Sequence, residues 1–174
     1  MTHPDRAIAA AGFRRRIYAG PGNFLRDLGR IARAFPTLLA LAGRHGISAG
    51  FRERLMLVVT AVNRCRHCAY GHEILARHAG LAPAEISALL GLDLHDSPAQ
   101  ELAGLRYAIH SAEHDGRPNA EARAMLEACY GADVARQIDM ACQLIQVGNR
   151  VGNSFDFLLS RLSRGRYGLL PGER

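Results

Sequence analysis

The apolar residues of this chain recur mostly at helical spacing, which predicts an all-α protein. The run from Leu55 to Val62 is ambiguous by itself, because a short apolar run fits a buried strand as well as a helix. Its surroundings favour a helix, since no residues nearby alternate with period two and the apolar positions after Cys65 again follow helical spacing. The pattern predicts helices at 5–16, 22–34, 50–62, 65–79, 83–90, 98–114, 119–131, 132–147 and 150–163, the last two nearly continuous.

Polar and small residues mark the expected ends of these helices. Asn63 is a favoured N-cap residue, so we expect it to separate two helices and to place Cys65 in the first turn of the second. Residues 97–100, Ser-Pro-Ala-Gln, have the spacing of an N-cap, an N1 proline and a capping-box amide. The tail from Gly165 onward is expected to be loosely held.

Chemistry is concentrated in residues 53–72, which contain Glu53, Cys65, His67, Cys68 and His72. At about 100° per residue, positions 65, 68 and 72 of a helix fall within about 60° of one another, whereas position 67 points away from them. Unpaired N–H groups at a helix N-terminus favour a thiolate, which is the nucleophilic form of cysteine. If the two helices form an antiparallel hairpin, Glu53 returns towards His72 and orients its ring, so that the ring can take a proton from Cys68.

The spacing Glu-x11-Cys-x2-Cys-x3-His, with a histidine directly before the second cysteine, resembles the signature of the alkylhydroperoxidase AhpD-like proteins. These proteins form part of the carboxymuconolactone decarboxylase superfamily, whose members are small and all-helical. The resemblance implies that the five residues above match the relay positions of the family. It also implies an AhpD-like multi-helix bundle with the CxxC motif at the N-terminus of a central helix.

The same resemblance implies a cysteine-based thiol peroxidase or disulfide reductase that uses no metal, haem or other cofactor. Its substrate would be a hydroperoxide, and its reductant an external dithiol or a lipoyl-type protein. Decarboxylase members generally lack the cysteine pair, so its presence argues against lactone decarboxylation. The resemblance further implies a homo-oligomer, a trimer or a hexamer, with active sites close to subunit boundaries.

Other interpretations of the cysteines remain to be weighed. Attachment of a c-type haem needs a histidine directly after the second cysteine, where this chain has Ala69. A structural zinc site could use Cys65, Cys68 and His72 with Glu53 as fourth ligand, although such sites usually join two separated knuckles. A thioredoxin-like fold would need strands around the motif, and none is predicted. A further alternative is a non-catalytic helical interaction module whose thiols sense redox conditions.

Composition agrees with one compact domain over residues 1–174, with a motif core at about 50–115, N-terminal helices within 1–45 and C-terminal helices at 119–163. The 174 residues are 48% hydrophobic and 22% charged, and four cysteines without a secretory signal suggest the reducing cytoplasm. The net charge of +6 could indicate nucleic-acid binding. Because the arginines are scattered among acidic residues and aromatic residues are only 6%, we do not expect nucleic-acid binding. No segment approaches the roughly 18 apolar residues of a membrane span, so we expect no membrane binding either.

Two further features complete the sequence-based picture. Cys142 lies on an apolar helical stripe, so we expect a small core residue and not a third redox centre. Large apolar residues are crowded near the C-terminus, and we expect them to form the contact between subunits, because they cannot all face one core. The crowded residues are Phe155, Phe157, Leu158, Leu159 and Leu162. The alternative is that the N-terminal helices cover these residues within the same chain.

Overall fold

The computed structural model describes residues 12–42 and 46–173, which contain helices and no strand. The all-α prediction is therefore confirmed. In chain order the elements are α1 (Pro21–Arg33), α2 (Phe35–Ala42), α3 (Ala49–Asn63), α4 (Arg66–His78), α5 (Pro83–Leu90), the short 3-10 helix η2 (Ala99–Glu101), α6 (Leu102–Glu113) and α7 (Ala120–Leu162). No helix in the described part of the chain combines the length and the apolar character needed to cross a membrane.

Helix α3 forms the centre of the core. Leu55, Leu57, Val58 and Val59 are at most 1% exposed, and α3 contacts α4, α5, α6 and α7. A helix that is apolar on all sides is stable only when neighbours surround it. The ambiguous run from Leu55 to Val62 is thus a buried helix, and it anchors the start of α4.

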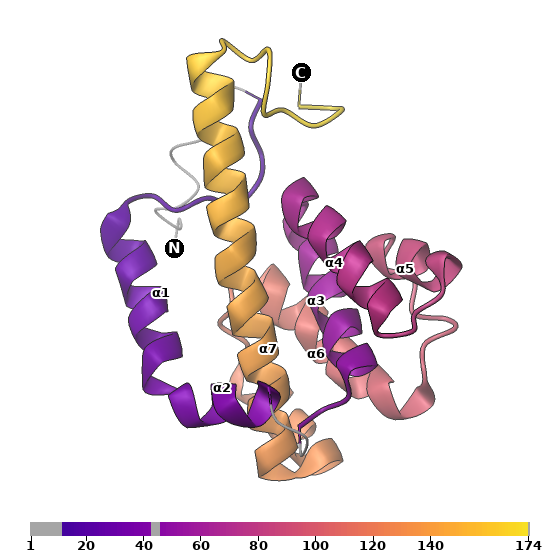
Figure 1. Ribbon diagram of the computed structural model, residues 1–174. Coiled ribbons are helices and arrows are strands. Elements are labelled where there is room, and N and C mark those ends of the chain that lie inside the picture. The colour runs from indigo at the N-terminus through magenta and orange to yellow at the C-terminus, as the bar shows by residue number, and fades with distance from the viewer. Residues whose placement is uncertain (1–11, 43–45, 174) are drawn as a thin grey trace.

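Helix α7 is the longest element and runs the height of the molecule, between α1 and the bundle formed by α3 to α6 (Figure 1). Its one break lies at Gly131, where φ is 75° and ψ is 160°, close to the predicted helix end. Beyond Gly131 the helix continues through Gly148 and Gly152, as expected. Its N-cap is Asn119, whose side chain accepts a hydrogen bond from the Ala122 N–H at 2.8 Å.

Several predicted boundaries are wrong. Residues 5–11 of the first predicted helix lie outside the described residues, and residues 12–16 are not helical. Helix α2, which was not among the predicted helices, begins immediately after α1 and includes Pro36, because proline is tolerated in the first turn of a helix. Ser97 does not cap α6, because a 3-10 turn with Pro98 at its N-cap precedes that helix.

The C-terminal tail is held firmly, contrary to expectation. Glu173 is 4% exposed and forms an ion pair with Arg15 of the N-terminal segment at 3.2 Å. Gly168, with φ of 81°, approaches the backbone of Asp156 so closely that a side chain at this position would collide with it. The segment around Arg15 and the tail therefore both lie against the last turns of α7.

Candidate functional site

The turn between α3 and α4 positions the two cysteines. Arg64 adopts the left-handed conformation with φ of 55°, and its N–H bonds to the carbonyls of Ala61 and Thr60. The Cys65 N–H bonds to the Thr60 carbonyl at 3.4 Å, which completes a Schellman-type helix end. Asn63 is accordingly the last residue of α3 and not the N-cap of α4, so that prediction is wrong.

Cys65 itself is the N-cap of α4. Its sulfur accepts a hydrogen bond from the Cys68 N–H at 3.3 Å, as the oxygen of a serine N-cap would. The two sulfurs form a disulfide, with Cα atoms 5.4 Å apart. Cys65 is 1% exposed and Cys68 is only partly buried. The CxxC motif therefore lies at the positive end of the α4 dipole, with Cys68 as its more exposed cysteine.

Glu53 and His72 form a carboxylate–imidazole pair beside the cysteines. The hairpin of α3 and α4 brings Glu53 Oε2 to 2.7 Å from His72 Nδ1, as the sequence predicted. Their side chains are 5% and 16% exposed, respectively. The bond to a carboxylate fixes the ring with its proton on Nδ1 and leaves Nε2 as the basic nitrogen. His72 lies one helical turn after Cys68 on the same face of α4.

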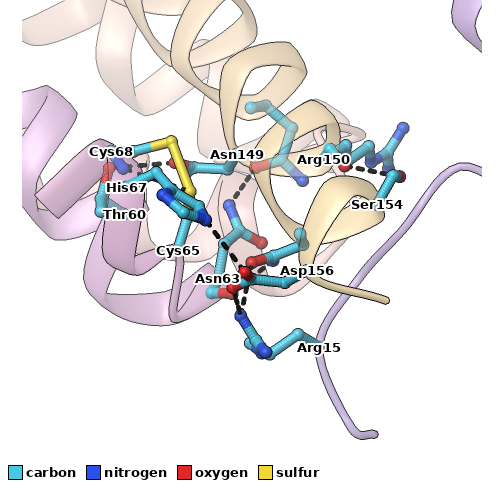
Figure 2. Close-up of a disulfide and its surroundings, with 12 residues drawn as sticks. Arg15, Thr60, Asn63, Cys65, His67, Cys68, Asn149, Arg150, Ser154 and Asp156 are labelled. Carbon is cyan, nitrogen blue, oxygen red and sulfur yellow. Dashed lines mark hydrogen bonds and ion pairs between the residues drawn. A yellow bond between two sulfur atoms is a disulfide. The ribbon is translucent and has the colours of Figure 1, made fainter. Parts of the chain in front are cut away.

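His67 leaves that face, as its helix position predicted, and reaches α7. Its Nε2 lies 2.9 Å from Oδ1 of Asp156, a carboxylate with no exposed side-chain surface. Figure 2 shows the imidazole between the disulfide and this carboxylate. The structure thus groups Glu53 with His72 and, separately, Asp156 with His67.

Asp156 accepts from two arginines as well. Arg15 Nη1 lies 2.6 Å from its Oδ2, and Arg66 Nη2 lies 2.6 Å from its Oδ1. Burial opposes ionisation of this carboxyl, but the hydrogen bonds from Arg15, His67 and Arg66 hold its pKa below the ordinary value. Glu173 behaves likewise: burial is outweighed by hydrogen bonds from backbone N–H groups and by the charge of Arg15, and its pKa is also lowered.

Polar side chains from α7 line the back of the site. Asn153 Nδ2 donates to the Asn63 carbonyl at 2.9 Å, and Thr60 Oγ1 donates to Asn149 Oδ1 at 3.2 Å. Both of these asparagines have no exposed surface. Because buried amides are costly unless they are hydrogen-bonded, these contacts fix α7 against the end of α3 in one register.

Gly152 is the point of α7 nearest to the disulfide. A Cβ atom built at this glycine would lie 2.8 Å from Cys65 Sγ, 3.6 Å from Cys68 Sγ and 3.8 Å from His67 Cδ2. Cβ atoms essentially never approach other heavy atoms more closely than 3.0 Å. The disulfide therefore packs directly on the backbone of α7, and only glycine fits at this position without movement.

Sequence reasoning found Glu53, Cys65, His67, Cys68 and His72 but missed Asp156, Arg15 and Gly152. One signal for Asp156 was available, because it interrupts the apolar residues from Phe155 to Leu159. A charged residue among large apolar ones on a buried helix needs a partner. The partners come from segments far away in the sequence, so the sequence could not name them.

The remaining cysteines lie apart from the CxxC motif. Cys142 is 2% exposed within the hydrophobic core, as expected, and burial together with the nearby Asp139 raises the pKa of its thiol well above the ordinary value. Cys129 is exposed and unpaired. Within residues 12–42 and 46–173, no group of three or more His, Cys, Asp or Glu side chains is placed to hold a metal ion.

An apolar stripe runs along the exposed side of α7. It consists of four side chains that are 46–75% exposed, namely Val151, Phe155, Leu158 and Leu162. The Phe155 ring also contacts His67 edge-on, with 5.9 Å between ring centroids. Phe157, in contrast, packs on Phe13 with centroids 5.4 Å apart, so the N-terminal segment, which is not helical at Phe13, covers part of the crowded apolar region.

The fold and the site together define an all-helical protein with a CxxC disulfide at a helix N-terminus and a carboxylate–imidazole pair next to it. The model of the carboxymuconolactone decarboxylase family matches residues 30–110, so this part of the chain is similar to that family. The match covers the five predicted site residues and excludes Arg15, Gly152 and Asp156. No curated protein and no solved structure is significantly similar to the chain.

Proposed function

We propose that this protein is a thiol peroxidase of the AhpD-like type, which reduces a hydroperoxide with Cys65 and Cys68. The family match makes an enzyme the natural interpretation, but the family name describes a decarboxylase. The observation that carries the proposal is the arrangement at the start of α4, where a bonded cysteine pair meets the hydrogen-bonded Glu53 and His72. A decarboxylation has no use for a cysteine pair that interconverts between dithiol and disulfide.

In the first step, Cys68 acts as the nucleophile. His72 takes the proton of the Cys68 thiol at Nε2, while Glu53 holds the ring through Nδ1. The thiolate attacks one peroxide oxygen, the O–O bond breaks, and Cys68 becomes a sulfenic acid. The leaving alkoxide takes the proton from His72 and departs as an alcohol. Cys68 is suited to this role because it is the more exposed of the two cysteines.

In the second step, Cys65 resolves the sulfenic acid. Its sulfur attacks the Cys68 sulfur, the S–O bond breaks, and the products are the disulfide and water. An external dithiol, free or carried as a lipoyl group on a protein, then reduces the disulfide by thiol–disulfide exchange and is itself oxidised. The protein needs no metal or organic cofactor in this scheme.

We further propose that the protein acts in the cytoplasm as a homo-oligomer, a trimer or a hexamer. The exposed apolar stripe of α7 supports association, because large apolar surfaces are rarely left in water. Phe155 belongs both to this stripe and to the surroundings of His67, so the contact would border the active site.

The test is peroxide consumption by the purified protein with several dithiols, including a lipoylated protein, together with mass spectrometry of the oxidised thiols. We expect turnover and a Cys65–Cys68 disulfide after peroxide treatment. A disulfide without turnover would favour the non-catalytic redox sensor. If no such disulfide formed, the proposal would be wrong.

A metal analysis addresses the zinc alternative. The proposed chemistry needs open thiols, so the purified protein should carry no stoichiometric zinc, and chelators should leave its activity unchanged. One zinc per chain, lost together with the fold on chelation, would favour a structural zinc site.

A further inference from the structure

A second carboxylate–imidazole pair, Asp156 with His67, adjoins the CxxC motif. Residues 67 and 72 are about 140° apart around a helix, so the two imidazoles of α4 project in different directions. His72 bonds to Glu53 of α3, and His67 bonds to Asp156 of α7. Asp156 lies outside the residues that the family model matches.

We infer that Asp156 is a positioning residue of the redox site, which holds His67 so that its Nδ1 serves as a second base for the cysteine thiols. This inference rests on the proposed thiol chemistry. The step is a proton transfer, in which the S–H bond of a cysteine breaks, the proton binds Nδ1 of His67, and a thiolate and an imidazolium result. When the thiolate has reacted, the imidazolium returns the proton to the departing oxygen.

The hydrogen bonds around Asp156 define the tautomer of His67. Arg15 and Arg66 supply charged donors to Asp156, which keep it in the carboxylate form that can only accept hydrogen bonds. His67 must therefore donate from Nε2, and in the neutral ring Nδ1 is then the unprotonated nitrogen. His72 has the opposite arrangement, because Glu53 bonds to its Nδ1.

Position and charge favour a role for this pair in proton transfer. His67 Cδ2 and both cysteine sulfurs surround the same point on α7, the place of a Cβ at Gly152. Figure 2 shows the ring next to Cys65. The charges of Arg15 and Arg66 balance those of Asp156 and Glu173, so the cluster is neutral without His67. Nε2 of the ring therefore faces a buried carboxylate, and Nδ1 is the nitrogen left to receive a proton from a thiol.

The first measurement is ¹⁵N NMR of the imidazoles in the reduced wild-type protein. We expect the neutral ring of His67 to carry its proton on Nε2, whereas that of His72 carries it on Nδ1. The opposite tautomer at His67 would overturn the inference. This measurement needs no substitution and no peroxide.

The second measurement is the rate of thiol alkylation by iodoacetamide between pH 5 and 9. We expect His67→Gln and Asp156→Asn each to slow alkylation of the reduced protein near pH 7 by roughly tenfold, the equivalent of about one pH unit. Asp139→Asn is the matched control, because Asp139 is another α7 carboxylate, bonded to Tyr107 and Gln143. We expect it to alkylate like the wild type.

Asp156 is buried among charges, so Asp156→Asn can fail to fold. The His67 side chain is 44% exposed, so we expect His67→Gln to fold. If Asp156→Asn does not fold, the alkylation rate of His67→Gln and the NMR tautomer of His67 test the inference. Wild-type alkylation rates in His67→Gln would overturn the inference. Neither measurement involves peroxide. If both gave the expected results and the protein did not turn over peroxide, the proposed function would be wrong and this inference would stand.

Discussion

Replacing Gly152 by alanine should make the disulfide easier to reduce. The added methyl carbon would lie 2.8 Å from Cys65 Sγ, and the nearby sulfur of Cys68 is fixed by the same bond. In the dithiol form, each sulfur can rotate away from α7 separately. The collision therefore destabilises mainly the disulfide form. Overpacking by one methyl group in a tight site costs about 1–3 kcal/mol. For a two-electron couple, this cost raises the reduction potential by roughly 20–60 mV.

The control for this prediction is Gly148→Ala, one turn earlier on the same helix. Its new methyl group would meet nothing closer than Ile145 Cδ1 at 4.0 Å. We expect a gain in stability of about 0.5–1 kcal/mol from helix propensity, equal in both redox states, and no change in potential. The assay is equilibration of each variant with dithiothreitol buffers, followed by mass spectrometry of trapped thiols. If Gly152→Ala kept the wild-type potential, or shifted it in the reducing direction, the packing of the disulfide on α7 would be refuted.

Three further predictions follow from the site and its surroundings. Cys65→Ser and Cys68→Ser should each abolish multiple turnover, while only Cys68→Ser blocks the first oxidation by peroxide. Cys142→Ser should retain turnover, and the reverse outcome would move the site elsewhere. Leu158→Arg should lower the mass measured by light scattering, because Leu158 is 53% exposed on the apolar stripe; a strictly monomeric wild type would contradict the oligomer. Burial opposes ionisation of Asp156, but its hydrogen bonds lower its pKa below 3.8. The ionised carboxylate therefore stabilises the folded state above pH 3.8, and this stabilisation is lost as the pH falls below that value. Urea unfolding should thus show the largest difference between the wild type and Asp156→Asn above pH 3.8, and a difference that grows with acid would refute the assignment.

Phe157 and Leu158 show what the apolar pattern of the sequence can predict about burial and what it cannot. Both residues lie on the C-terminal part of α7, and their crowding indicated that some apolar side chains must leave the core of this chain. The pattern could not tell which ones, because Phe13 of the N-terminal segment covers Phe157 and leaves Leu158 exposed. The interface test therefore belongs on Leu158, since Phe157→Arg would also disturb packing within the chain.

The sequence by itself determined the all-α class, most of the helices and one face of the site. Helical spacing placed Cys65, Cys68 and His72 together, because neighbours three and four residues apart on a helix are always close. The return of Glu53 followed from a hairpin of two adjacent helices with a short connection. Where the local prediction was wrong, at Asn63, the error was small, since helix ends depend on which of several polar groups bonds to the last turn.

Only the tertiary structure decided the other side of the site. Arg15, Gly152 and Asp156 meet the CxxC motif from segments that are about 50 to 90 residues away along the chain. Their approach depends on how α7 packs against α3 and α4 and on how the N-terminal segment and the tail close over its last turns. Such contacts arise from the register between packed helices, which no local periodicity specifies. Helical geometry thus fixed the spacing of the cysteines, and the packing of α7 fixed what surrounds them.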